Sequence, residues 1–156
     1  MRVPSLDDVL RTFPLDRVGI EFKTDGDEAR LCTLLRARKR TRSVFVSSGG
    51  DGPVTRFKAI CPEAVTTVTD AMEAQYLRAE ATHAPWCAPV SIGQPPLAFR
   101  DFRLTKNDVD WDHDHGLADY AWTANTRPQL EVVAKLGVDA VYTDRPDIAK
   151  SVFSGH

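Results

Sequence analysis

Strands and helices alternate along this chain, and that alternation constrains its fold more than any other feature of the sequence. Residues 18–23 alternate apolar and polar side chains as a half-buried strand does, and residues 29–35 repeat apolar side chains at helical spacing. The same succession predicts further strands at 43–48, 64–68, 118–123 and 139–143, and further helices at 5–13, 54–60, 70–77, 106–115, 126–136 and 146–152. Because crossover helices make successive strands parallel, the sequence predicts an α/β fold with about five parallel strands.

One segment interrupts the pattern. Residues 85–96 hold four of the ten prolines, which remove backbone donors and break regular structure, so a long loop is expected there. Neither a shift in composition nor a low-complexity segment divides the chain, and we therefore expect a single domain over residues 1–156.

Composition excludes several classes of protein. With 22 acidic and 20 basic side chains the net charge is -2, which excludes a strongly basic nucleic-acid binder. No stretch approaches the roughly 20 apolar residues that a membrane span requires. Pro4, Asp7 and Asp8 interrupt the apolar core that a signal peptide would need. The cysteines, at 32, 61 and 87, are odd in number and lack close spacing, which predicts reduced thiols and a cytoplasmic location.

Polar side chains stand at the carboxyl ends of the expected strands, where parallel barrels build their active sites. Glu21 and Lys23 lie on one face of the first strand, about 7 Å apart. A carboxylate so placed can hold a divalent cation while the ammonium holds an anionic substrate. The alternative is a structural ion pair that covers the end of an open sheet.

Five segments, taken in order, resemble the glycerophosphodiester phosphodiesterase family: residues 4–10, 20–23, 45–48, 121–125 and 136–147. The resemblance implies a (β/α)8 barrel that hydrolyses glycerophosphodiesters in lipid metabolism, with a divalent metal such as Ca²⁺ or Mg²⁺. It implies that Glu21 is a metal ligand and that Lys23 contacts the substrate phosphate. It also implies that Trp122 lines the pocket for the alcohol, with Asn125 beside it in the substrate site in a positional role.

The chain also departs from the family. The family's His-Arg-Gly, Glu-x-Asp and His-Asp strands precede the helix that resembles residues 4–10, so the acid and base histidines and most metal ligands are missing from this sequence. A closed barrel takes about 250 residues. We therefore expect a partial TIM barrel of about five β/α units without its first three, an incomplete metal site, and little activity in the isolated chain. Its open sheet edges predict self-association, or pairing with a complementing amino-terminal half.

Two alternatives stay open. Beside the phosphodiesterase interpretation they are a non-catalytic module that binds phosphate esters through Lys23 and Arg145, and a truncated gene product. Two charged segments are assigned structural roles. The basic run at 36–42 is expected to end a helix rather than bind nucleic acid or lipid. The acidic, histidine-containing segment 108–115 lacks the glycine and glutamate of an ion-binding loop and is expected to be a solvated helix face.

Overall fold

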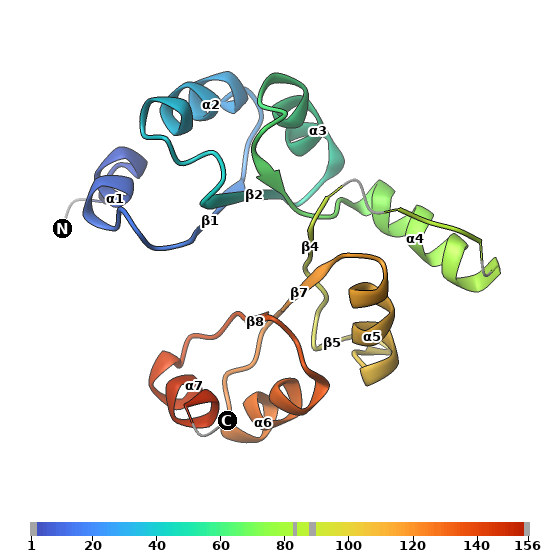
Figure 1. The fold of residues 1–156 in the computed structure, drawn as a ribbon. Coiled ribbons are helices and arrows are strands. Elements are labelled where there is room, and N and C mark those ends of the chain that lie inside the picture. Colours follow the sequence, from blue (N-terminus) through green and yellow to red (C-terminus); the bar gives the residue numbers. More distant parts are fainter. Residues whose placement is uncertain (1–2, 83, 88–89, 155–156) are drawn as a thin grey trace. The chain divides into compact units, whose positions relative to one another are not determined.

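A computed structural model describes residues 3–82, 84–87 and 90–154 of the chain (Figure 1). It divides into two compact units, Met1–Ala84 and Pro85–His156, and each is described by itself.

The first unit follows the predicted alternation of helix and strand. Its elements are α1 (Leu6–Thr12), β1 (Val18–Phe22), α2 (Glu28–Ala37), β2 (Val44–Ser48), α3 (Asp51–Ile60), β3 (Val65–Thr66) and α4 (Asp70–Thr82). A capping box begins α1, in which the Ser5 hydroxyl accepts from the backbone N–H of Asp8 and the Asp8 carboxylate returns a bond to Ser5. The predicted strands and helices of this unit are therefore confirmed, with shorter strands and a longer α4.

The three strands of the first unit form a parallel sheet in the order β1-β2-β3. Val18 pairs with Val44 and Glu21 with Ser47, so the carboxyl ends of β1 and β2 lie level with each other. The core beneath them is apolar and includes Leu35, Val46 and Phe57, none of which is exposed to solvent. Burial of these side chains holds α2 and α3 on the sheet and so fixes the strand ends that carry the polar residues.

Cations of the basic run at 36–42 have partners within the protein. Arg36 pairs with Glu63, and Arg38 pairs with Asp7 at 2.6 Å. Arg40 is buried and donates to the backbone carbonyls of Leu10 in α1 and of Phe13 and Asp16 after it. These contacts support the structural role expected for the run.

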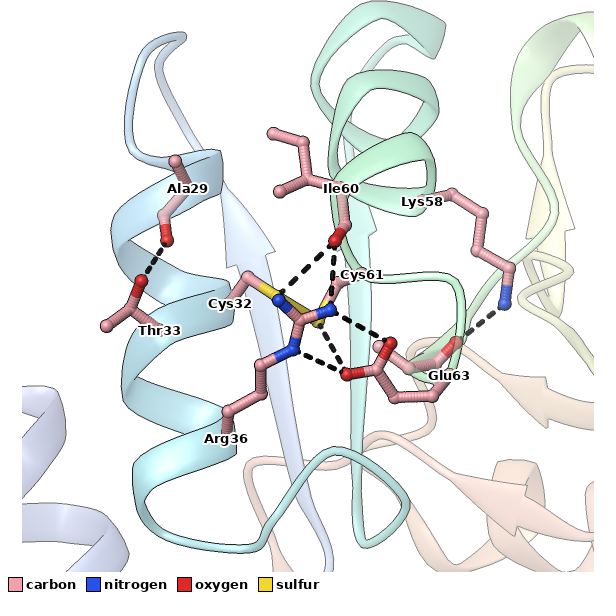
Figure 2. The surroundings of a disulfide bond; sticks show 9 residues. Ala29, Cys32, Thr33, Arg36, Lys58, Ile60, Cys61 and Glu63 are labelled. Carbon is pink, nitrogen blue, oxygen red and sulfur yellow. Dashed lines mark hydrogen bonds and ion pairs between the residues drawn. A yellow bond between two sulfur atoms is a disulfide. The ribbon is translucent and has the colours of Figure 1, made fainter.

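A disulfide joins Cys32 of α2 to Cys61, which ends α3 (Figure 2). Both sulfur atoms lie in the core, whereas Cys87 is a free, exposed thiol. The prediction that Cys32 and Cys61 are reduced thiols is therefore wrong. Sequence spacing could not reveal the pair because 29 residues separate the two cysteines, and only the packing of α2 against α3 brings their Cα atoms to 5.8 Å.

The second unit contains more strand than the sequence predicts. Its elements are β4 (Ile92–Gly93), β5 (Ala98–Phe99), β6 (Phe102–Arg103), α5 (Lys106–Asp114), β7 (Ala118–Ala121), α6 (Arg127–Leu136), β8 (Ala140–Val141) and α7 (Pro146–Phe153). β4 lies inside the proline-rich segment that was expected to be a loop. It pairs parallel with β7, which in turn pairs parallel with β8. The prediction of about five parallel strands is thus too low, because the described residues contain six.

Local signals set the helix ends of the second unit. Capping boxes begin α5 at Thr105 and α6 at Thr126, and Gly137 ends α6 with a positive φ of 82°. Leu130 and Val133 of α6 pack with Ala149 and Val152 of α7 in an apolar cluster against the sheet. Among the described residues, no helix is both long enough and apolar enough to cross a membrane.

Candidate functional site

One candidate site, in the first unit, is the carboxyl end of β1. Lys23 Nζ lies 2.7 Å from Glu21 Oε2, so the two predicted residues form an ion pair. The side chains are 44% exposed for Glu21 and 76% exposed for Lys23, and both are therefore open to a ligand. Ser47, which stands opposite Glu21 on β2, is buried and supports the strand end.

A second candidate site, in the second unit, surrounds Trp122, which directly follows β7. The Trp122 indole N–H donates to the backbone carbonyl of Gln94 at 2.6 Å, and its backbone N–H donates to Pro95. Gln94 also donates from its side-chain amide to the Tyr142 hydroxyl. The indole is thus fixed at one edge by the proline-rich segment, while 40% of the residue remains exposed to solvent.

Asn125 joins the loops that follow β7 and β8. Its side-chain amide donates to Asp144 Oδ2 at 2.7 Å, and its side-chain carbonyl accepts from the backbone N–H of Asp144 at 2.7 Å and from the Thr143 hydroxyl at 3.3 Å. Both ends of the side chain are therefore occupied by protein groups. This arrangement fits the positional role expected for Asn125, and contact with a substrate remains a prediction.

The residues described do not fit a Ca²⁺ or Mg²⁺ site. Such ions take six or more oxygen ligands, and Glu21 offers one carboxylate that is already paired with Lys23. In the part of the chain that the structure describes, one set of three residues brings possible ligand atoms within 4.8 Å of one another, namely Cys32, Cys61 and Glu63. The two sulfurs are bonded to each other, and the Glu63 carboxylate accepts two hydrogen bonds from Arg36 (Figure 2).

Sequence reasoning missed three residues around these sites. Gln94 of the proline-rich segment accepts from the Trp122 indole and donates to the hydroxyl of Tyr142, the residue after β8. Gln94 belongs to no quoted motif, and Tyr142 lies within segment 136–147 but was given no role. Asp119 of β7 is fully buried, and it was expected only as one residue of a strand. The burial of Asp119 could have been predicted from the alternation of side chains in the strand, because Asp119 lies on the same face as the apolar, buried Ala121.

A family model described as the glycerophosphoryl diester phosphodiesterase family matches residues 1–148. No curated protein sequence matches the chain.

Several solved structures share the fold. A glycerophosphodiester phosphodiesterase from Agrobacterium tumefaciens str. C58 superposes with a TM-score of 0.73 at 22% identity, over 98% of this chain and 63% of its own. A phosphodiesterase from Oleispira antarctica, in complex with the product sn-glycerol-3-phosphate, gives 0.66 at 19% identity, over 97% and 61%. A glycerophosphoryl diester phosphodiesterase from Parabacteroides distasonis gives 0.70 at 18% identity, over 99% and 56%. The chain thus spans less than two thirds of the length of each of these structures.

Proposed function

Because the chain belongs to the glycerophosphoryl diester phosphodiesterase family, we propose that it takes part in the hydrolysis of a glycerophosphodiester to an alcohol and glycerol phosphate. The observation that carries this proposal is the exposed Glu21–Lys23 pair at the carboxyl end of β1. In parallel α/β barrels, that end of the strands is where substrates bind.

Each proposed role follows from the chemistry of the side chain. The Lys23 ammonium supplies a positive charge and three donors for a phosphate, and it need only exchange its exposed partner Glu21 for the ligand. Trp122 offers a flat apolar face to the carbon skeleton of the alcohol, with its N–H already satisfied by Gln94. Glu21 is proposed as one ligand of the family's divalent metal, whose other ligands these residues do not supply.

We also propose that the isolated chain hydrolyses substrate weakly or not at all. Phosphodiester cleavage needs a positioned proton donor as well as charge stabilisation. The two histidines described, His113 and His115, are held elsewhere: His113 bonds to Asp139 at 2.9 Å, and His115 stacks on Trp111.

A non-catalytic module that binds phosphate esters is the second candidate function. It would use Lys23 and Arg145, both at carboxyl ends of strands. Arg145, however, donates twice to Asp147, at 3.0 and 2.7 Å, so its guanidinium is engaged by its own helix. Lys23 is therefore the stronger of the two candidate anion contacts.

Binding and turnover are expected to separate in the isolated chain. We expect purified chain to bind glycerol phosphate in calorimetry without hydrolysing glycerophosphocholine in the presence of Ca²⁺ or Mg²⁺. Lys23→Met should weaken binding by about tenfold to a hundredfold, because one charge-assisted contact to phosphate contributes on the order of 1.5–3 kcal/mol. The matched control is Arg17→Met, which removes one exposed positive charge at the opposite end of β1 and should leave binding unchanged.

Different outcomes separate the candidate functions. Turnover that Glu21→Ala abolishes would refute the inactivity of the chain and support the family's reaction. Absence of binding by wild-type protein would remove the binding module and leave a truncated product as the explanation.

Self-association is also proposed, because β1 is an edge strand. In the described sheet β1 pairs with β2 alone, which leaves a row of backbone donors and acceptors for another strand. Sedimentation should therefore show a concentration-dependent increase in mass. A stable monomer across the concentration range would contradict this expectation.

Two broader expectations stay predictions. We propose that the two units form one domain, since the family match runs from residue 1 to 148 and crosses both. The cytoplasmic location is a prediction against which the Cys32–Cys61 disulfide weighs, because disulfides persist mainly in oxidising compartments.

A further inference from the structure

Two aspartates, one on β7 and one on α5, meet in the interior of the second unit. Asp119 of β7 has 0% of its surface exposed, and Asp112 of α5 has 8% exposed. Neither carboxylate oxygen of Asp119 has a hydrogen-bond donor among the described residues. An isolated carboxylate without donors is among the most costly groups to bury, so the ionisation state of Asp119 has to be explained.

The two carboxyl groups converge over a glycine. A Cβ atom built on Gly93 of β4 would lie 3.2 Å from Asp119 Oδ1 and 3.7 Å from Asp112 Oδ2. Gly93 itself is buried, so the space above it is closed to solvent. The carboxyl groups of Asp112 and Asp119 therefore converge on the same side of Gly93, close to where a side chain at this position would stand.

The other charged groups nearby do not neutralise this pair. Burial and the contact with Asp112 raise the pKa of Asp119 to about 9, and the negative charges of Asp139, just before β8, and Asp108 of α5 add to the rise. The His113 ring bonds to Asp139 Oδ2 at 2.9 Å, and the same oxygen accepts from the backbone N–H of Asp119 at 2.8 Å. His113 therefore interacts with Asp139 and not with the buried pair of Asp112 and Asp119.

Either a bound cation or a bound proton would offset the negative charge that the two carboxyl groups place in the interior. Among the described residues, no third carboxylate, thiol or imidazole joins these two carboxyl groups in a set whose ligand atoms lie within 4.8 Å of one another. A Ca²⁺ or Mg²⁺ ion would therefore need water for most of its about six or more ligands, in a place where Asp119 is fully buried. A single proton needs two oxygens, one to carry it and one to accept it. Two carboxyl groups that share a site satisfy this need, because like charges at close range cannot both stay ionised.

We propose that Asp112 and Asp119 form a buried acid pair that keeps one proton at neutral pH and fastens α5 to β7, and that loss of this proton at alkaline pH loosens the helix from the strand. The shared proton gives Asp119 the hydrogen bond that no other described group supplies. Without it, two negative charges would face each other in the core. The pair is thus a pH-sensitive contact between α5 and the strand that leads to Trp122.

Side-chain carbon NMR of the full chain, labelled at aspartate Cγ, tests the proposal directly. We expect one aspartate resonance to titrate with a midpoint near 9, and to be absent from Asp119→Asn. The matched control is Asp110→Asn, which removes an exposed carboxylate of the same helix that pairs with Lys106, and it should keep the alkaline titration. The wild-type titration decides the question even if Asp119→Asn fails to fold.

Hydrogen exchange tests the link to α5. After correction for intrinsic exchange rates, protection of the α5 amides should fall by about tenfold or more between about pH 7 and 10 in the wild type, and much less in Asp119→Asn. Titration of every aspartate below about pH 5 would overturn the proposal. So would a shift of the alkaline midpoint on addition of Ca²⁺ or Mg²⁺, which would identify the pair as a cation site.

Discussion

Reduction of the Cys32–Cys61 disulfide is expected to lower the free energy of unfolding of the first unit by about 3–4 kcal/mol. The bond closes a loop across 29 residues of sequence, and the chain-entropy relation assigns a cross-link of that span a stabilisation of this size. The bond also joins α2 to α3 in the core. Urea unfolding with and without a thiol reductant, followed by far-UV circular dichroism, measures the difference.

The double variant Cys32→Ala, Cys61→Ala provides the control. It lacks the cross-link in both conditions, so the reductant should not change its unfolding midpoint. Cys87→Ser, which removes the exposed free thiol, should keep the full response to reductant. Equal midpoints for oxidised and reduced wild-type protein would contradict a stabilising disulfide.

The second large effect is expected from Asp119→Asn, which should raise the free energy of unfolding at pH 7 by up to about 4 kcal/mol. In the folded protein burial and the contact with Asp112 raise the pKa of Asp119 to about 9, from the ordinary value of 3.8. At pH 7 ionisation of this group stabilises the unfolded chain, whereas in the folded chain the group stays protonated and gives no such stabilisation. About three pH units separate 3.8 from 7, at 1.36 kcal/mol each. Asparagine keeps the shape and removes this penalty.

The pH dependence of the free energy of unfolding tests the same assignment, and its direction can be predicted. Because the folded state binds the proton more tightly, the stability contributed by Asp119 is complete below about pH 4 and is lost as pH rises toward 9. Stability curves measured from pH 5 to 9 should therefore fall more steeply for wild type than for Asp119→Asn. Asp110→Asn should follow the wild-type slope, and parallel slopes in all three proteins would contradict the assignment of the proton to Asp119.

Much of the secondary structure could be predicted because its signals are local. The Thr126 capping box and Gly137 mark both ends of α6 within a dozen residues of sequence. The alternation in β1 places Glu21 on a solvent-facing side and leaves Phe22 buried. Lys23 follows two residues after Glu21, so their ion pair also depends on local geometry.

β4 could not be predicted from the sequence, because a strand of two residues is too short to show an alternation of apolar and polar side chains. Ile92 and Gly93 become a strand only by pairing with Ala118 and Asp119, more than twenty residues away. The same pairing explains why Gln94, directly after β4, reaches Trp122. A pattern confined to one segment carries no information about such partners.

The sequence by itself determined the strand and helix alternation, the family to which the chain belongs, and the ion pair at the end of β1. Each of these depends on residues close together in the chain. Tertiary structure alone decided that Cys32 meets Cys61 and that Asp119 faces Asp112 over Gly93. Both results depend on which distant side chains share the low-dielectric core. There two thiols come close enough to form a disulfide, and a carboxyl group beside another carboxyl group is favoured in its protonated form.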